Sequence, residues 1–458
     1  MLEFQSLVLA AGRGSRLPDV GGTVSKCLLP VGPYPVLWYS LNMLEKMGFQ
    51  DTLVVVLSDD QYAITSALEK CPLKIKYTLV SIPSEEDWGT ADSLKHISNR
   101  ILKTTDILVV PGDLITNINL NDVLNLHRKH DASLTTLFFN NGPEEWIELP
   151  GLKSKVKPDR DLVCIDKETQ RLVFLASASD FEESVTLPRI LMKRFDSVSL
   201  YSRLLDAHVY VMKKWVINYL VESERFTSVK GEFIPYIVKK QLSKRKNLND
   251  KKGLSEKNLD ITVDIFDYSL ENGFESKIRE MSSYNEHRSG SKGVCHNDIL
   301  RCYAHIPSKS TFGMRINTLS TFYLCNNKIL SKWEEITGSP LTERFYSSSE
   351  VNTKQIDENS TVGDKSIVNE KTSIKCTFIG ANCVIENKVR LTNCILMNNV
   401  IIKEGSVLQD CIIYTGATVE ASCSMQYCLI GPHHIVSSST SSNHQLHAET
   451  TENMITLG

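Results

Sequence analysis

Short apolar runs alternate with longer amphipathic stretches in the first part of the chain. Apolar runs of this length are typical of buried strands, and stretches of one to two dozen residues between them suit helices. The runs are 7–11, 53–57, 107–111 and 133–139, and helix-length segments such as 35–48 and 90–103 lie between them. This order predicts βαβ units and a mostly parallel sheet.

The pattern changes after residue 160. Runs at 161–165 and 171–176 flank a polar turn, which predicts a hairpin, and 205–212 has the character of another strand. The segment 227–241 is typical of a capped helical region that starts near Thr227 or Ser228.

Residues 242–297 are mostly charged and polar, with few apolar clusters. We interpret this segment as a mobile insertion. Order resumes with a predicted strand at 302–306 and a helix over 316–325 that opens at Asn317 or Thr318.

The last third of the chain carries a six-residue repeat. Period six fits neither an amphipathic helix nor an ordinary strand, but it is the signature of a parallel β-helix in which each unit points one apolar side chain inward. The expected inward residues are Val389, Ile395, Ile401, Val407, Ile413, Val419 and Met425, with Val362, Val368 and Ile374 in a different phase. Glycines suit the corners of the coils, and they occur at Gly363, Gly380, Gly405, Gly416 and Gly431.

Composition limits the classes of function. The chain has 458 residues and a formal net charge of −3, so it lacks the basic balance of a protein that binds nucleic acid directly. No apolar run approaches the roughly 18 residues that cross a membrane. The apolar residues at the N-terminus run straight into a glycine motif, which indicates a first strand and not a signal peptide.

The 12 cysteines form no CxxC pair. Six of them lie in the repeat, where small apolar residues are wanted: Cys376, Cys383, Cys394, Cys411, Cys423 and Cys428. We interpret them as reduced, buried thiols of a cytosolic protein. A zinc site is the alternative, and the lack of close Cys/His pairs argues against it.

One string, LVLAAGRGSRL at 7–17, indicates a phosphate-binding turn. A buried strand runs into Gly12 and Gly14, whose backbone N–H groups could approach phosphate oxygens, and Arg16 and Lys26 add positive charge. Leu17 stands where the dinucleotide fingerprint has its third glycine, and no Gly-Lys-Ser/Thr of a P-loop follows.

The string resembles the signature of the sugar-phosphate nucleotidyltransferases, with Ser25-Lys26-Cys27 in place of the family's Pro-Lys-Pro. Trp88-Gly89-Thr90-Ala91 resembles the family's turn near the nucleotide base, and Gly112-Asp113 its Gly-Asp, whose carboxylate holds Mg²⁺. The resemblance implies an α/β nucleotidyltransferase-like domain with a Rossmann-like mixed sheet, followed by a left-handed parallel β-helix.

The family's chemistry needs a second carboxylate, because Mg²⁺ usually binds through one or two carboxylates plus phosphates. The matching stretch lies near 302–325, yet no Asp or Glu occurs from Ile299 to Trp333. We therefore expect no catalytic residue, no bound metal and no cofactor. Gly12, Gly14, Arg16, Lys26, Gly89 and Asp113 are interpreted as a vestigial nucleotide pocket, with Asp113 a turn residue and with Gly12 and Gly14 kept for a tight turn in folding.

The segments 205–215, 227–241 and 302–327 resemble the gamma subunits of eukaryotic translation initiation factor 2B. The resemblance implies a non-catalytic subunit of the cytosolic complex that exchanges GDP for GTP on initiation factor 2. It implies direct pairing with the epsilon subunit, which carries the exchange domain, within a larger multi-subunit assembly. Initiation factor 2 is the expected substrate of the complex, including its form phosphorylated on the alpha subunit. The chain ends about twenty residues after its last predicted coil, which leaves no room for an exchange domain.

Two alternatives remain. An active nucleotidyltransferase would need a carboxylate from elsewhere, such as Asp206, and a free-standing binding module would not associate with epsilon. His433-His434 could serve an acyltransferase, but we expect them to cap the open end of the β-helix.

The predicted domains are 1–330 (nucleotidyltransferase-like, with the insertion 242–297), a linker at 331–355, the β-helix at 356–436 and a disordered tail at 437–458.

Overall fold

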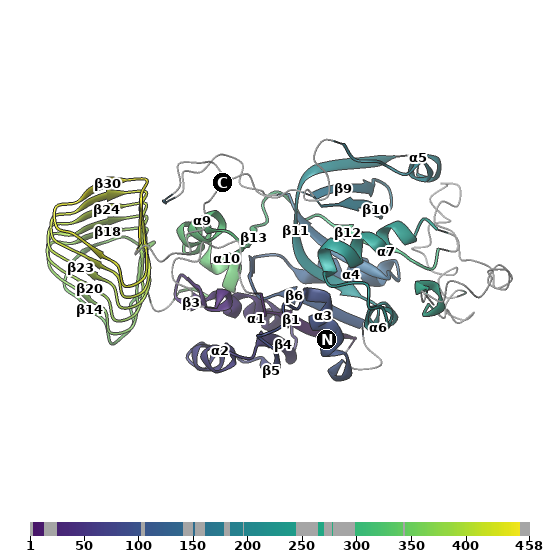
Figure 1. Ribbon diagram of the computed structural model, residues 1–458, viewed down its shortest axis with the longest axis horizontal. Coiled ribbons are helices and arrows are strands. Elements are labelled where there is room, and N and C mark those ends of the chain that lie inside the picture. The colour runs from purple at the N-terminus through teal and green to yellow at the C-terminus, as the bar shows by residue number, and fades with distance from the viewer. Residues whose placement is uncertain are drawn as a thin grey trace.

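The computed structural model describes residues 3–12, 25–101, 106–140, 150–151, 161–177, 184–195, 197–243, 264–269, 277, 298–341 and 344–448. An α/β domain and a stack of short-stranded coils lie side by side (Figure 1).

The α/β domain is built on a nine-stranded sheet with the order β10-β9-β11-β6-β1-β4-β5, to which β8 and β12 are joined through β11. Strands β1, β4, β5 and β6 are parallel, as are β8 and β12, whereas β11 runs antiparallel to β6, β8 and β9. The strands are β1 Phe4–Leu9, β4 Asp51–Leu57, β5 Lys76–Ile82, β6 Asp106–Pro111, β8 Leu134–Phe139, β9 Asp161–Asp166, β10 Leu172–Ala176, β11 Val198–Met212 and β12 Cys302–His305. The predicted mixed, mostly parallel sheet and the hairpin at 161–176 are confirmed.

Helices cover the sheet, so its central strands are buried on both faces. In β1, Leu7 packs into one apolar cluster and Val8 into the other, which explains the continuous apolar run in the sequence. The helices are α1 Val36–Lys46, α2 Gln61–Leu68, α3 Thr90–His96, α4 Leu120–Lys129, α5 Arg189–Arg194, α6 Lys214–Glu222, α7 Ile234–Lys240, α9 Leu319–Ile329 and α10 Trp333–Thr337. No helix within these described ranges is long and apolar enough to cross a membrane.

The predicted helix starts are confirmed by their caps. The Ser228 side chain accepts a hydrogen bond from the backbone N–H of Gly231, at the start of a π-helical turn, η4 Val229–Phe233, that leads into α7. Thr318 caps α9 and forms a capping box with Thr321. Each cap satisfies a backbone donor that the helix itself leaves free.

Most of the predicted insertion, 242–297, lies outside the described residues. Among its described residues, 264–269 contain a short 3₁₀ helix, η6 Ile265–Asp267, whose Ile265 and Phe266 are buried in the main apolar cluster. This piece therefore belongs to the core, and the prediction of an excursion is wrong for it.

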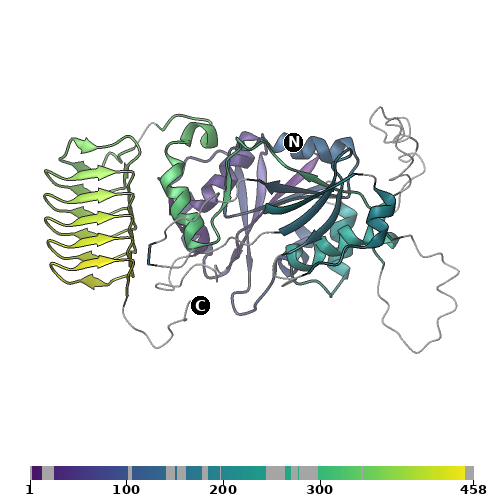
Figure 2. The same cartoon turned by 90° about the horizontal axis from the view of Figure 1, so that it is seen from above.

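The coils form three parallel sheets of six strands each, the architecture of a left-handed β-helix (Figure 2). One sheet contains β14 Glu350–Val351, β17 Ile367–Val368, β20 Val384–Ile385, β23 Ile401–Ile402, β26 Thr418–Val419 and β29 Ile435–Val436. The second contains β15 Gln355–Ile356, β18 Ser373–Lys375, β21 Arg390–Thr392, β24 Val407–Gln409, β27 Ser424–Gln426 and β30 Ser441–Asn443. The third contains β16 Thr361–Val362, β19 Phe378–Ile379, β22 Ile395–Leu396, β25 Ile412–Ile413, β28 Leu429–Ile430 and β31 Leu446–His447.

The β-helix is longer than its predicted range of 356–436. It starts at Glu350, inside the predicted linker, and ends at His447, inside the predicted disordered tail. The last coil is hard to recognise because Ser442 and His447 occupy inward positions, in register with Met425 and Ile430 of the coil before. Polar residues at these positions hide the repeat, and the remaining tail from 449 lies outside the described residues.

The predicted set of inward side chains is partly wrong. Val389, Ile413, Val419 and Met425 lie in the β-helix core, but Ile401 and Val407 point outward and Ile395 faces the α/β domain. Val362, Val368 and Ile374 are buried in this core as predicted. From there on, the core is lined by Ile379, Ile385, Leu391, Leu396, Ile402, Leu408, Ile413, Val419, Met425, Ile430 and Val436. Equivalent residues such as Leu396 and Ile413 are 17 apart, so each coil has steps of six, six and five residues.

The residue two positions before each core residue is mostly small and fills the rest of the interior. The cysteines of the repeat were predicted to be buried thiols of this kind. Five are buried there, whereas Cys376 is half-buried at a corner: Cys383, Cys394, Cys411, Cys423 and Cys428. No group of three or more His, Cys, Asp or Glu side chains suited to a metal occurs in the described ranges.

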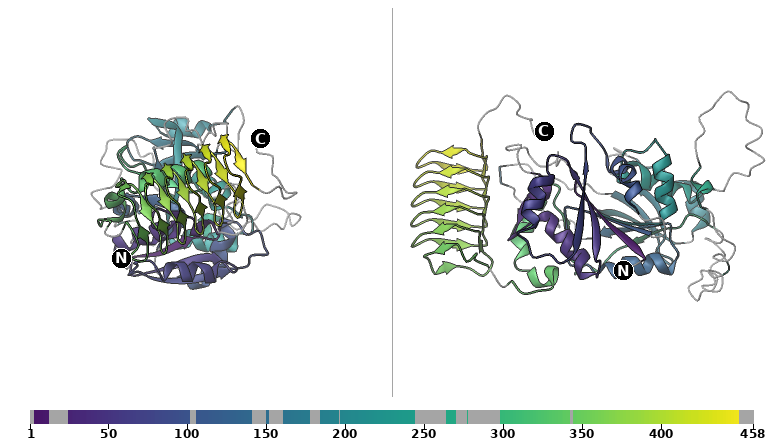
Figure 3. Two further views of the ribbon diagram at one scale, coloured as in Figure 1. Left: turned by 90° about the vertical axis from the view of Figure 1, so that its left-hand side faces the viewer. Right: turned by 90° about the horizontal axis from the view of Figure 1, so that it is seen from below.

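The third sheet packs against the α/β domain. Its outward residues Ile395, Ile412 and Leu429 share an apolar cluster with Phe322 of α9 and Trp333 of α10. The hydroxyl of Tyr323 also donates a hydrogen bond of 2.7 Å to the Asp410 carboxylate. The stack of coils therefore stands directly against the α/β domain (Figure 3).

Candidate functional site: a nucleotide-type pocket

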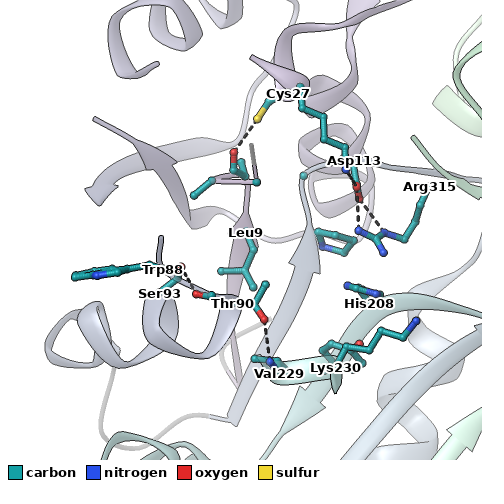
Figure 4. Close-up of a pocket in the computed structure, with 18 residues that line it drawn as sticks. Leu9, Cys27, Trp88, Thr90, Ser93, Asp113, His208, Val229, Lys230 and Arg315 are labelled. Carbon is teal, nitrogen blue, oxygen red and sulfur yellow. Dashed lines mark hydrogen bonds and ion pairs between the residues drawn. The ribbon is translucent and has the colours of Figure 1, made fainter. Parts of the chain in front are cut away.

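A pocket opens beyond the carboxyl ends of β1 and β6. These strands lie where the chain turns to opposite sides of the sheet, a position at which α/β proteins commonly bind ligands. Residues after β1 and β6, the start of α3, the middle of β11, η4 and the short strand β13 Gly313–Arg315 line it (Figure 4). The described residues enclose about 140 Å³, well below the roughly 300–1,000 Å³ of a ligand pocket.

Four of the six predicted site residues meet in this pocket: Gly12, Lys26, Gly89 and Asp113. Gly14 and Arg16 fall within 13–24, outside the described residues. Ser25-Lys26-Cys27, which replaces the family's Pro-Lys-Pro, opens a short 3₁₀ helix, η1 Lys26–Leu28, in which the Cys27 thiol donates to the backbone carbonyl of Ala10 at 2.8 Å.

The two described glycines have different surroundings. A Cβ on Gly12 would meet no atom of the described residues within 4 Å. A Cβ on Gly89 would lie 2.0 Å from the carbonyl oxygen of Thr227, which also accepts from the N–H of Ala91. Gly89 is thus required for the packing of α3 against the segment that leads into η4.

Asp113 is held by two cations. Arg315 binds it with both arms, from Nε to Oδ1 at 3.0 Å and from Nη2 to Oδ2 at 2.9 Å, and Lys26 Nζ contacts Oδ2 as well. Burial alone would raise the pKa of Asp113, but Arg315 and Lys26 hold it well below its usual range. Asp113 is therefore a charged, structurally engaged residue, and the prediction of a mere turn residue understates its role.

Arg315 reaches Asp113 because of a local strand pairing. β13 runs antiparallel to β7 Leu114–Thr116, which places Arg315 opposite Leu114, and the N–H of Ile316 donates to the carbonyl of Asp113 at 2.9 Å. The predicted Asn317-Thr318 turn then starts α9. Sequence reasoning missed Arg315, although a basic residue two positions before the neutral Asn317 was a usable signal.

Asp206, the carboxylate that an active enzyme could have used, does not line the pocket. It accepts hydrogen bonds from the N–H of His208 at 2.7 Å and the hydroxyl of Tyr210 at 2.8 Å. Burial raises its pKa, although Lys230 counteracts this. His208 sits at an irregularity of β11 with φ of 53°, and it faces the pocket in place of Asp206.

The described lining does not suit Mg²⁺. It offers one carboxylate, Asp113, whose oxygens are taken by cations, and three cationic side chains, Lys26, Lys230 and Arg315. Lys230 is in turn paired with Asp161 at 3.0 Å. A divalent cation would have to displace Arg315 and Lys26 and would meet their positive charge, so the fixed charges oppose metal binding here.

His433 and His434 lie at an internal corner of the β-helix. His433 adopts φ of 56° and its N–H donates to the carbonyl of Thr415 in the coil below, with its ring close to Gly416. Because one more coil follows, the prediction that these residues cap the open end is wrong.

Comparisons with known proteins place both parts of the chain. Residues 5–145 match the family model described as nucleotidyl transferase, and residues 343–441 match the one described as EIF2B subunit epsilon LbH domain.

Similar proteins include three named translation initiation factor eIF2B subunit gamma. That of Caenorhabditis elegans is 33% identical over 250 residues, which cover 53% of this chain and 59% of the relative. That of Dictyostelium discoideum is 24% identical over 400 residues, covering 81% and 86% respectively. That of Schizosaccharomyces pombe is 29% identical over 246 residues, covering 53% of each. The chain thus spans little more than half of two of these relatives, and the resemblance to gamma subunits is confirmed.

Proposed function

We propose that this chain is a non-catalytic structural and regulatory subunit of translation initiation factor 2B, the complex that exchanges GDP for GTP on initiation factor 2. The observation that carries the proposal is the engagement of Asp113 by Arg315 and Lys26. The carboxylate that would hold the metal of a nucleotidyltransferase has become the centre of a buried ion cluster.

Physical chemistry supports the loss of catalysis. Nucleotidyl transfer builds negative charge around the reacting phosphorus, and a metal ion normally neutralises it and orients the pyrophosphate. Arg315 and Lys26 could supply positive charge, but both already form ion pairs with Asp113. Without a free carboxylate among the described lining residues, this part of the pocket lacks the arrangement that would distinguish the transition state from the ground state.

The partners follow from the relatives' names. We propose direct pairing with the epsilon subunit, inside an assembly with the other factor 2B subunits in the cytosol. Initiation factor 2 would be the substrate of that assembly, including the form phosphorylated on its alpha subunit. The pocket would remain as a vestige of the nucleotidyltransferase ancestor. Its residues would be Gly12, Lys26, Gly89 and Asp113, together with Gly14 and Arg16.

Affinity purification of the tagged chain, with identification of its partners, tests the proposal. We expect epsilon and the other factor 2B subunits in the eluate at constant ratios. A second arm incubates the purified chain with sugar phosphates, GTP or ATP and Mg²⁺. We expect no pyrophosphate above that of an Asp113→Ala control.

The alternative is an active sugar-phosphate nucleotidyltransferase, which the match of residues 5–145 to that family favours. Pyrophosphate release at enzymatic rates, abolished by Asp113→Ala, would support it. The absence of factor 2B subunits from the eluate would count against the proposed function.

A further inference from the structure

Helix α9 lies between the sheet of the α/β domain and the coils of the β-helix (Figure 1). It begins at Leu319, shortly after Arg315, which binds Asp113 with both arms. The N–H of Ile316 donates to the carbonyl of Asp113 at 2.9 Å, so two consecutive residues before the helix are fixed to one residue of the pocket. We call Asp113, Arg315 and Lys26 the charge cluster. The start of α9 is therefore tied to this cluster.

The second cation of the charge cluster is connected to the same helix. Lys26 lies in η1, and the chain continues from there into β2 Pro30–Val31 and the turn at Gly32. The side chain of Asn326 in α9 accepts from the N–H of Gly32 at 3.1 Å and donates to the carbonyl of Pro30 at 3.4 Å. Both cations of the cluster are thus attached to α9, each through its own segment.

The middle of α9 contacts the β-helix. The Tyr323 hydroxyl donates to the Asp410 carboxylate at 2.7 Å, and the Asn393 amide donates to the same oxygen at 2.9 Å. Asp410 is only 4% exposed, so water is a poor substitute for these donors. Phe322, next to Tyr323, packs with the outward side chains of the third sheet. The helix that is tied to the pocket is therefore also the helix on which the β-helix rests.

One apolar cluster joins these contacts. It contains side chains from both pocket segments, from α9 and from the third sheet, among them Leu29, Ile316, Phe322, Ile412 and Leu429. Close-packed side chains do not move independently, because both voids and overlaps cost free energy. Packed helices consequently slide as units when a neighbouring segment shifts. A displacement of either pocket segment must be taken up by α9 and, through it, by the contact with the β-helix.

We propose that α9 couples the charge cluster of the pocket to the contact between the α/β domain and the β-helix. With the cluster intact, Arg315 and Lys26 hold the two segments in place and Tyr323 reaches Asp410. When the cations leave Asp113, the segments relax, α9 shifts, and the bond from Tyr323 to Asp410 weakens. An anion that competes with Asp113 for the two cations would act on the β-helix in this way. This coupling is a property of the chain itself and is independent of the proposed function.

The test is a double-mutant cycle in the full chain, measured as the equilibrium constant of denaturant unfolding. Asp113→Asn perturbs the charge cluster, and Tyr323→Phe removes only the hydroxyl that binds Asp410. Asp113 and Tyr323 share no hydrogen-bond partner within the described part of the chain. Effects of independent sites on the constant multiply to within about twofold, whereas coupled sites typically deviate by about fivefold or more.

Tyr323→Phe should have different effects in the two backgrounds. In the wild type we expect it to raise the unfolding constant about tenfold or more, because a buried carboxylate loses a donor. In the Asp113→Asn chain the same substitution should raise the constant by about fivefold less, because the bond is already weakened. Arg315→Lys keeps the charge but loses the two-armed contact, so it is a milder change to the cluster. It should reduce the effect of Tyr323→Phe in the same direction, and it serves where Asp113→Asn does not fold.

Ser406→Ala is the matched control. The Ser406 hydroxyl is buried in the β-helix and donates to the carbonyl of Glu420 at 3.0 Å. It lies at the corner between β23 and β24, opposite the sheet that contacts α9. Its effect on the unfolding constant should be the same, within about twofold, with and without Asp113→Asn.

The outcomes decide the proposal. Equal effects of Tyr323→Phe in both backgrounds would overturn it. So would an effect below about twofold in the wild type, since α9 would then contribute no hydrogen bond of consequence to the β-helix. A loss of effect for Ser406→Ala as large as that for Tyr323→Phe would show that Asp113→Asn loosens the whole chain, and the role of α9 would be wrong. None of these measurements involves epsilon, so the proposed function stands or falls separately.

Discussion

Asp113, Arg315 and Lys26 form a cluster whose charges have little contact with water, since their side chains are 8%, 18% and 14% exposed. Removing one member of a buried ion pair leaves the others uncompensated. We expect Asp113→Asn to destabilise the chain by about 3 kcal/mol, as measured by denaturant unfolding. Asp59→Asn, at an exposed turn, is the control and should change stability by less than about 0.5 kcal/mol. An unchanged midpoint for Asp113→Asn would mean that the cluster adds nothing to the fold.

The same cluster predicts how stability depends on pH. The pKa of Asp113 is lower in the folded chain than the value of about 3.9 in an unfolded one, because Arg315 and Lys26 outweigh burial. Such a group stabilises the fold above its unfolded pKa, and the contribution is lost as pH falls from there through the folded pKa. Between pH 5 and about pH 3, the wild type should therefore lose more stability than Asp113→Asn. Parallel curves of unfolding free energy against pH would contradict this.

Gly12 and Gly89, two of the glycines that line the pocket, give a matched pair. Gly89→Ala would put a Cβ 2.0 Å from the carbonyl oxygen of Thr227, so the contact between α3 and η4 must open. We expect a loss of roughly 2 kcal/mol or more in thermal or denaturant unfolding. Gly12→Ala meets no atom of the described part of the chain within 4 Å and should leave stability nearly unchanged. Equal effects of the two substitutions would show that packing does not explain the Gly89 motif.

At the residue scale, the sequence predicted part of the site. It brought Gly12, Lys26, Gly89 and Asp113 together because family motifs carry them. It could not place Arg315, which reaches Asp113 only because β13 pairs with β7. Arg315 and Asp113 are 202 residues apart in the sequence. A missing carboxylate is visible in a sequence, but the side chain that fills its place depends on tertiary contacts.

At the element scale, the repeat was recognised but its phase drifted. A count of six residues per step gives the correct core residues from Ile413 to Met425. It gives Ile401 and Val407 where the core residues are Ile402 and Leu408, because one side of each coil has five residues. A slip of one residue moves a side chain from the core to the surface. Adjacent apolar pairs such as Ile401-Ile402 hide the slip, since both neighbours look suited to the core.

This register predicts opposite effects for two isoleucines. Ile413 is fully buried in the β-helix core, and Ile413→Asp would bury an unpaired charge at a cost of several kcal/mol. Ile401 points outward, and Ile401→Asp should change the stability of the isolated chain by less than about 1 kcal/mol. Thermal unfolding of both variants measures the difference. If Ile401→Asp were the more damaging, the six-six-five register would be wrong.

At the scale of the whole molecule, the sequence predicted two ordered parts but not how they meet. In the sequence, the strands of the third sheet show the same pattern as those of the other two sheets. In the structure, their outward residues Ile395, Ile412 and Leu429 are buried against α9 and its neighbours. Nothing in the spacing of these residues separates a face covered by the same chain from one left for a partner. Only the structure shows that this face is covered by the α/β domain.

The contact between the two parts predicts how the chain unfolds. Ile412 is fully buried in the cluster that joins them, next to Phe322 and Tyr323 of α9. Ile412→Asp places a charge in that cluster but leaves Ile413 in the β-helix core, so it should separate the two parts while each keeps its own interior. Calorimetry should then resolve two transitions where the wild type has one, and small-angle scattering should report a larger radius of gyration. Val407→Asp is the control, because Val407 points outward from the second sheet of the β-helix, and it should keep the wild-type profile. A single transition for Ile412→Asp at the wild-type temperature would show that the β-helix and the α/β domain are joined by something other than this apolar contact.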